Sequence, residues 1–285
     1  MFKSEIEKRL NKTDYTRLPR IMGIEESFEN ITNNDHYRDM LQIADTCGIK
    51  YLSFYKLKNG ISINNLIRNI QTINYTPNLP YIDGQETLSI AKVQISASGF
   101  EVISNFYTVN EIWVKSPDGR TQTLQSVQER RVVHIQFDYN RLVLVASIDP
   151  IGLGVNVSES LSLSLEQIFN NFDIDFNDTF DSIDLEPHIY TKIDSNEFRP
   201  TRINNKDENR NIEHFSEARN PNDSLTDQDC YIRMRNSELD INRMKLKNDD
   251  TRMIIELFGK DIIRVWNKSN WEQLNELKNS FIAVL

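Results

Sequence analysis

The chain has 285 residues, of which 39% are hydrophobic and 26% are charged, and its formal net charge at pH 7 is −9. This is a globular composition with enough apolar side chains for a substantial core, and no apolar run approaches the roughly 20 residues of a membrane-spanning helix. The first residues lack the apolar region of a secretory signal. Cys47 and Cys230 stand alone and form neither a disulfide framework nor a zinc pattern. We therefore expect a reduced, soluble, cytoplasmic protein.

The negative charge is concentrated in one part of the chain. Residues 151–229 carry 6 basic and 17 acidic side chains, whereas residues 1–80 and 230–285 each have a small excess of basic ones. From Leu142 to Thr191 there is no Lys or Arg. This acidic segment would repel a polyanion, so any nucleic acid would bind the N-terminal or C-terminal part.

The N-terminal part reads as helical. Helices are predicted over Phe2–Asn11, about Asn34–Thr46 and Ile63–Ile73, on the basis of apolar spacing and capping residues. Pro19 is expected to interrupt the chain after the first helix, and Pro77 and Pro80 mark a linker. Residues 1–80 are therefore predicted to form a helical N-terminal region.

The piece from Leu41 to Ile70 resembles the small helical nucleic-acid-binding motifs of the SAP and Rho N-terminal type. Those motifs pair a helix that ends in a Gly-Ile turn with a later helix of the pattern LIxxI. The matching positions are Leu41, Ala44, Gly48, Ile49, Leu66, Ile67 and Ile70. The resemblance implies phosphate contacts from Lys50, Lys56, Lys58 and Arg68. The alternative is a pair of helices that only pack in a core.

After Thr87 the pattern changes to a period of two residues, which indicates strands. The predicted strands are Leu88–Ser96, Glu101–Val109, Glu111–Lys115, Arg120–Val127, Arg131–Asp138 and Leu142–Ile148. The strongest signal is the hairpin Arg130–Pro150, whose second strand is a nearly unbroken apolar run typical of a strand covered on both faces. Short sequential strands joined by tight turns predict an antiparallel meander. His134 alternates with the apolar residues of its strand and is expected to point outward.

Taken together, these patterns predict an α+β fold with a central antiparallel β-meander, an N-terminal helical segment and a C-terminal β-hairpin plus helix. Ser158–Phe172 is read as a helix from about Ser162. Few large apolar residues occur in the polar stretch Asp194–Gln228, so we expect a mobile insertion there. A hairpin is predicted around Phe258, and Ser269 is predicted to cap the last helix. Residues 85–285 would then form one α+β domain.

The most specific polar pattern is Asp173–Asp184, which resembles an EF-hand calcium loop. Its oxygen-bearing side chains at the ligand spacing are Asp173, Asp175, Asn177, Asp181 and Asp184. Asp178 replaces the glycine that the sharp turn of such a loop needs. The alternative is a solvated acidic loop that faces a basic partner. No cofactor is expected unless this loop holds calcium or magnesium.

Two basic clusters stand out. The first is Arg130 with Arg131, and the second has five cations within fifteen residues: Arg233, Arg235, Arg243, Lys245 and Lys247. Tyr231 and two methionines lie within or beside the second cluster. Either cluster would suit phosphate or an acidic protein face, and the alternative is an ordinary solvated strand and helix.

Catalytic signatures are missing from the sequence. There is no GxxxxGK(S/T) phosphate loop and no GxSxG elbow, and the four histidines are not at metal-ligand spacing. We therefore expect a non-enzymatic binding or scaffold protein within a larger protein or protein–nucleic acid assembly. The alternative is a metal-dependent hydrolase or nuclease with carboxylates brought together by the fold, which would suit an accessory protein of a bacterial or phage conflict (defence) system.

Overall fold

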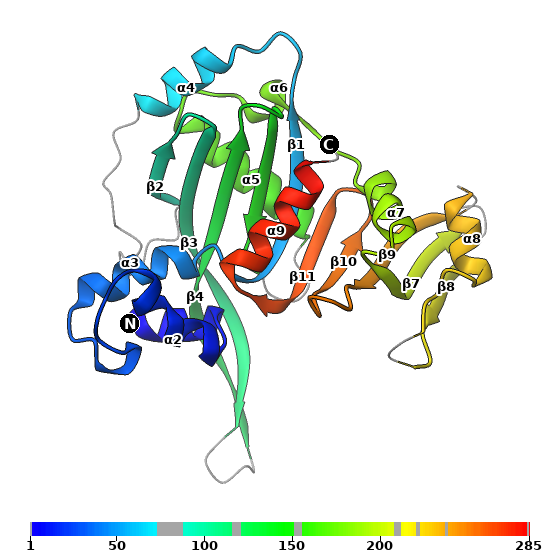
Figure 1. The fold of residues 1–285 in the computed structure, drawn as a ribbon, viewed down its shortest axis with the longest axis horizontal. Helices are drawn as coiled ribbons and strands as arrows, with labels where there is room; N and C mark the ends of the chain where they lie inside the picture. Colours follow the sequence, from blue (N-terminus) through cyan, green and yellow to red (C-terminus); the bar gives the residue numbers. More distant parts are fainter. Residues whose placement is uncertain are drawn as a thin grey trace. The chain divides into compact units, whose positions relative to one another are not determined.

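The computed structural model describes residues 2–72, 88–115, 121–150, 156–207, 212–220, 223–236, 239–283 and 285. The fold is α+β, as the sequence predicts, and its elements are drawn in Figure 1. The chain divides into two compact units. Unit 1 combines Met1–Lys56 with Ser182–Leu285, and unit 2 is Leu57–Asp181. The predicted division near residue 80 falls in residues 73–87, outside the described residues.

Unit 1 is built on antiparallel strands in the order β1, β11, β10, β9, β7, β8. Their bounds are β1 (Gly48–Leu57), β11 (Ile262–Ser269), β10 (Ile254–Phe258), β9 (Asp240–Lys247), β7 (Arg199–Asp207) and β8 (Ile212–Glu217). The predicted hairpin around Phe258 is confirmed as β10 and β11. The polar stretch predicted to be an insertion without regular structure instead contains β7 and β8, which corrects that prediction.

One face of these strands forms the core of unit 1. The register aligns Leu52, Ile263, Leu257 and Met244 across four neighbouring strands, and all four are fully buried. Side chains alternate between the two faces of a strand, so the residues next to these point the opposite way. Helix α9 (Trp271–Ile282) packs on the core face, where Phe281 lies 5.4 Å from Phe54 between ring centroids.

The last helix begins with a capping box. Asn270, not the predicted Ser269, is the N-cap: its side chain accepts from the Gln273 backbone N–H, and the Gln273 side chain accepts from the Asn270 backbone N–H. Two further helices of unit 1 are α7 (Glu186–Asp194) and α8 (Asp229–Arg235). The short strand β6 (Phe180–Ser182) precedes α7.

The N-terminal helices of unit 1 pack around aromatic rings. They are α1 (Phe2–Arg9), α2 (Lys12–Ile21), the 3-10 turn η1 (Phe28–Asn30) and α3 (Asn34–Ala44). The ring of Phe28 lies 4.7 Å from Tyr15 and 5.5 Å from Tyr37 between centroids. Pro19 lies inside α2 rather than interrupting the chain, which corrects the expectation from its residue type.

Unit 2 contains the predicted meander, in the strand order β2, β3, β4, β5. Its elements are α4 (Ile63–Gln71), β2 (Ser89–Ile95), β3 (Gly99–Lys115), β4 (Gln122–Asp138), β5 (Val143–Ile148), α5 (Val157–Asn170) and α6 (Phe176–Thr179). All six residues of β5 are buried, as its apolar run predicts. The four short strands predicted between residues 101 and 138 are two long ones, paired continuously from Gly99 with Asp138 to Lys115 with Gln122.

The outer halves of β3 and β4 extend past their neighbours. Strand β2 pairs with β3 only as far as Asn105, and β5 pairs with β4 only from Val133 onward. Beyond these points the two long strands pair with each other as a twisted ribbon (Figure 1).

The piece that resembles the SAP and Rho N-terminal motifs does not fold as one helical module. Its Gly-Ile turn opens strand β1, which runs for ten residues between α3 and α4. Helix α3 also belongs to unit 1 and helix α4 to unit 2. The local helix predictions are thus confirmed, but the motif that would join them is not formed.

Candidate nucleic-acid interface

The second basic cluster is divided by the fold. Arg243, Lys245 and Lys247 lie at alternate positions of β9 and therefore share one face of the sheet. Arg233 and Arg235 lie on α8, where Arg235 forms an ion pair with Asp194 and stacks 4.4 Å from the Tyr190 ring centroid. Only the β9 part of the cluster is thus a candidate for a sheet-surface site.

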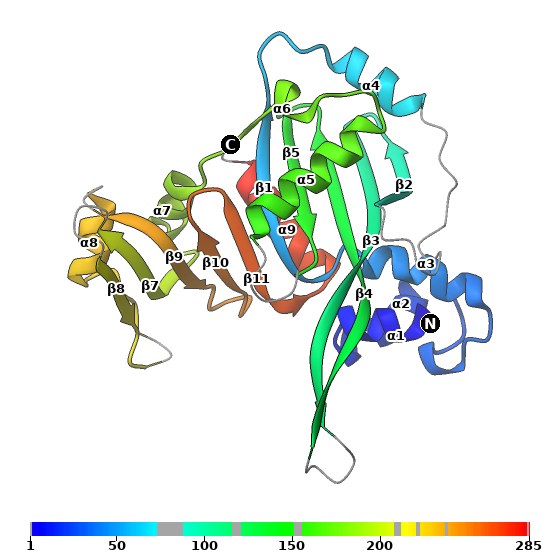
Figure 2. The same ribbon diagram turned by 180° about the vertical axis from the view of Figure 1, so that it is seen from behind.

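The three β9 cations lie opposite the core, on the outer face of unit 1. The register aligns Lys245 with Glu256 and Glu256 with Arg264, and in the neighbouring row it aligns Arg243 with Phe258. Helices α7, α8 and α9 lie on the other side of these strands in Figure 1, and in Figure 2 no helix of unit 1 covers β9, β10 and β11. We call the set Arg243, Lys245, Phe258, Arg264 and Trp266 the basic-aromatic face.

Cations and rings are interleaved on the basic-aromatic face. The Arg264 guanidinium lies 3.7 Å and the Lys245 ammonium 4.9 Å from the Trp266 ring centroid. The Arg243 guanidinium lies 4.8 Å from the centroid of Phe258. A cation over a ring face is attracted by the ring quadrupole, and unlike an ion pair this contact leaves the positive charge in place.

The charge of these cations is not neutralised within the described part of the chain. Neither Arg243 nor Lys245 nor Arg264 has a carboxylate oxygen within 4.0 Å among the described residues. Glu256 lies between two of them and accepts a hydrogen bond from the Trp266 indole N–H at 2.8 Å, and its one negative charge still leaves an excess of two positive charges among these four side chains. The basic-aromatic face is therefore positively charged although the chain as a whole is acidic.

Cations at the margin of this face are paired. Asp249 accepts hydrogen bonds from Arg199 and Lys247, which lower the pKa of its carboxyl far below the usual range. Arg202 on β7 forms an ion pair with Glu217 on β8 and lies 5.4 Å from the ring centroid of Phe215. Arg199, Lys247 and Arg202 thus have carboxylate partners, unlike the three cations of the basic-aromatic face.

Exposed aromatic side chains lie on the same outer face of unit 1. Of the Phe, Tyr and Trp side chains whose exposure the structure describes, a set that leaves out Trp113, two fall in the exposed class, Phe215 at 60% and Trp266 at 37%. Phe215 aligns through Asn204 with Arg243, so it extends the row of Phe258 on the outer face. Two exposed rings on one face beside unpaired cations are the composition of a stacking surface for nucleobases.

The other predicted contact residues are placed differently. Lys50 is fully buried, and its ammonium donates to the Asp45 backbone carbonyl at 2.6 Å, so it is not on the surface. Arg130 is also buried, and Arg131 forms an ion pair with Glu129. Three others lie elsewhere on the chain: Lys56 at the end of β1, Lys58 just after it, and Arg68, which is exposed on α4.

The acidic segment does not adopt the open loop of an EF-hand. Residues 176–179 form helix α6, which Asp175 caps by accepting from the Asp178 backbone N–H at 2.9 Å. The Lys58 ammonium lies 3.5 Å from the Asp181 carboxylate. Among the described residues, no group of three or more His, Cys, Asp or Glu side chains is arranged to hold a metal ion. The predicted set Asp173, Asp175, Asn177, Asp181 and Asp184 thus gains no geometric support as a calcium or magnesium site.

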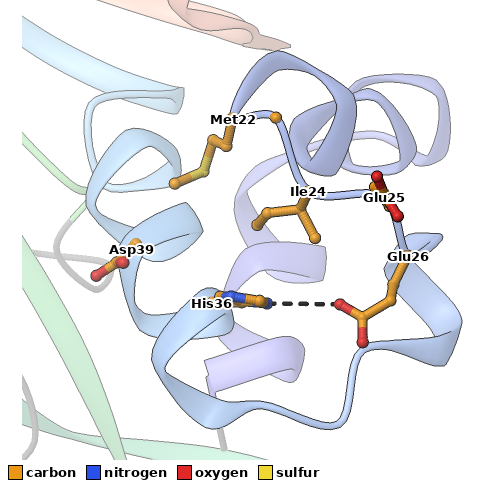
Figure 3. A pocket seen from close by; sticks show the side chains of 7 residues that line it. Met22, Ile24, Glu25, Glu26, His36 and Asp39 are labelled. Atoms are coloured by element: carbon orange, nitrogen blue, oxygen red, sulfur yellow. Dashed lines mark ion pairs between the residues drawn. The ribbon is translucent and has the colours of Figure 1, made fainter.

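A cavity of about 580 Å³ opens among the N-terminal helices of unit 1 (Figure 3). Its lining residues are Met22, Gly23, Ile24, Glu25, Glu26, His36 and Asp39. The imidazole of His36 lies 3.6 Å from the Glu26 carboxylate. Three carboxylates at the rim favour cations and repel phosphate, so this cavity is unsuited to the ligand that the basic-aromatic face would attract.

In unit 2, the face of strand β4 that carries His134 was expected to be exposed, and it instead holds a contact between His134 and Glu101. His134 is 1% exposed, which corrects the prediction that it points outward. Its ring nitrogen lies 2.7 Å from Glu101, which also forms an ion pair with Lys92 at 2.8 Å. Burial opposes ionisation of Glu101, but the contacts with His134 and Lys92 outweigh burial and lower its pKa to about 2.

Comparison with known proteins adds no assignment. No protein-family model matches the chain, and a search of curated proteins finds no relative. Among the described helices, none is both long enough and apolar enough to cross a membrane.

The sequence contained part of the signal for this face. In β11 the apolar residues Ile263 and Val265 alternate with Arg264 and Trp266, and this spacing alone puts Arg264 and Trp266 on the same side as each other. Phe215 was missed because it lies in the polar stretch that was expected to lack regular structure. Its strand β8 pairs with β7, and β7 pairs in turn with β9, which begins some 25 residues after Phe215, a pairing that no local pattern reveals.

Proposed function

We propose that this chain is a non-enzymatic nucleic-acid-binding protein that acts within a larger assembly and uses the basic-aromatic face of unit 1. The observation that carries the proposal is the set of three cations held against aromatic rings without a carboxylate partner in the described residues. An acidic protein gains nothing in solubility from unpaired positive charge on the outer face of a sheet, so a ligand that needs this charge is the natural explanation.

Two ligand classes would satisfy the charge, an acidic protein surface and a nucleic acid backbone. The rings favour the second. Trp266 and Phe215 present exposed aromatic surface, and aromatic side chains on a sheet are the usual platform on which nucleobases stack. Carboxylates of an acidic protein would use the cations but leave the rings without partners.

The proposal is tested by fluorescence anisotropy with a labelled mixed-sequence oligonucleotide at low salt. Replacing Arg243 and Lys245 together by alanine removes two cations from outward-facing strand positions and is expected to weaken binding about tenfold or more, or ~1.4 kcal/mol. Both side chains point away from the core, so folding should be preserved.

A matched control removes the same charge elsewhere in unit 1. Lys12→Ala with Arg20→Ala deletes two exposed cations from helix α2, with the same change in net charge. This control should bind like the wild type. Equal affinity of both double variants would contradict the proposed role of the basic-aromatic face, and binding only to an acidic protein would point to the other ligand class.

A further inference from the structure

We infer that the basic-aromatic face takes single-stranded nucleic acid, with bases stacked on Trp266 and Phe215 and phosphates against Arg243 and Lys245. This inference rests on the proposed function and adds the class of nucleic acid. It is carried by two observations that do not depend on charge: which rings are exposed, and how one of them is held.

The exposed rings are concentrated rather than scattered. Wherever the structure describes the exposure of a Phe, Tyr or Trp side chain, which it does not for Trp113, every ring except Phe215 and Trp266 is buried or half-buried, and these two lie on the outer face of the same sheet. Leaving a large ring in water forgoes the stabilisation that burial would provide. Two such exceptions on one face mark a surface that a ligand covers.

Trp266 is fixed before any ligand arrives. Its indole N–H donates to Glu256 at 2.8 Å, and the Arg264 guanidinium lies 3.7 Å from its ring centroid. These two partners are directly opposite each other on β10 and β11, so the indole is held against the strands and its exposed part faces solvent. A ring ordered in advance binds a base without a further loss of rotamer freedom.

Phe215 lies at the far side of the same surface. Four strand spacings separate β11 from β8, about 19 Å at ~4.8 Å per strand. Arg243 and Lys245 lie on β9, between the strands that carry the two rings. Rings at the ends and cations between them match a strand of nucleic acid that crosses the sheet with its backbone over β9.

Base pairing determines whether a nucleic acid can stack its bases on these rings, so the face should distinguish single strands from duplexes. In a duplex the faces of the bases are stacked on one another and cannot reach rings on a flat sheet, whereas an unpaired strand can splay its bases onto them. A duplex would therefore use only the cations of this face, and a single strand would use both the cations and the rings.

The experiment compares three ligands with the full-length chain: a single strand of about 20 nucleotides, the duplex of the same sequence, and heparin as a polyanion without bases. We expect the single strand to bind about tenfold more tightly than the duplex. Trp266→Ala and Phe215→Ala should each weaken single-strand binding about tenfold and leave heparin binding unchanged. Ile232→Ala removes an exposed apolar side chain from helix α8 and is the matched control.

A second readout separates stacking from a general effect on the fold. Single-stranded ligand should quench tryptophan fluorescence in the wild type, and Trp266→Phe should lose most of this quenching while retaining most of the affinity, because a ring remains. Circular dichroism confirms that each variant is folded.

The outcomes distinguish the two proposals. Equal binding of single strand and duplex, unaffected by the ring variants, would overturn the inference and leave the proposed nucleic-acid function standing. Binding of heparin alone, or of none of the three ligands, would overturn both.

Discussion

Glu101 shows how a carboxylate is kept ionised at a half-buried position of unit 2. The strand register places it on the same face as His134, and His134 and Lys92 both contact its oxygens. Burial alone would raise its pKa, but these two contacts lower it to about 2. Because the folded pKa is depressed below the ordinary value of 4.5, the ionised form stabilises the fold above that pH and this contribution is lost as the pH falls toward 2.

Glu101→Gln is therefore expected to destabilise the protein by about 1–2 kcal/mol at pH 7, because a charged hydrogen-bond acceptor is replaced by a neutral one. The difference from wild type should narrow as the pH falls below about 4.5. Urea denaturation at a series of pH values measures both effects. Glu159→Gln, at an exposed site on α5 in the same unit, is the control. A difference that stays constant with pH would show that the charge of Glu101 is not its source.

Single residues also show where sequence patterns stop being informative. Alternation in β4 correctly separates His134 from the apolar side chains of Val133 and Ile135, but it does not reveal that both faces are buried there. Lys50 was expected to contact phosphate because of the resemblance to the SAP and Rho N-terminal motifs. Its acceptor, the Asp45 carbonyl, lies at the end of the preceding helix and was not visible from residue type.

Among the elements, the β3–β4 hairpin depends on one glycine. Gly99 pairs with Asp138 at the inner end of the hairpin, and a Cβ atom at Gly99 would lie 2.0 Å from the Phe137 carbonyl oxygen. No flexible side chain can give way there, because the obstacle is backbone.

Gly99→Ala should therefore cost about 1–3 kcal/mol of stability, as other overpacked sites do. Urea denaturation monitored by circular dichroism gives the value. Ser98→Ala changes the exposed neighbour and should remain within about 0.5 kcal/mol of wild type. If the two variants are equally stable, the backbone at Gly99 adapts more easily than its geometry indicates.

Element prediction succeeded where the signal was local. The helices α3 and α4, the strand β5 and the β10–β11 hairpin all carry their own periodicity and caps, so they were found within a few residues. It failed where a segment becomes a strand only because it pairs with a neighbouring strand. Strands β7 and β8 are polar on their own and form because β9 provides a hydrogen-bonded template for β7. The same dependence explains why four short predicted strands are two long ones.

At the scale of the whole chain, the acidic total conceals a basic surface. The net charge of −9 arises chiefly from residues 151–229, whereas the unpaired cations lie on β9 and β11. Charge counting along the sequence located β9 as basic, but it did not reveal that Arg264 and Trp266 are its neighbours across β10. The sequence alone thus pointed to Arg243 and Lys245. Placing Phe258, Arg264 and Trp266 beside them required the strand register.

Salt dependence tests whether binding uses this local surface or the field of the whole molecule. Three unpaired cations would displace counterions from about three phosphates, which predicts a slope of log K against log salt of about −2 for a single strand. Lys245→Ala should make the slope shallower by about 0.7, because one phosphate contact is lost, whereas Lys12→Ala on helix α2 should not change it. Anisotropy titrations across a range of salt concentrations supply the slopes. A slope near zero, or one that the α2 variant changes as much as the β9 variant, would show that these cations do not act as the phosphate contacts of the site.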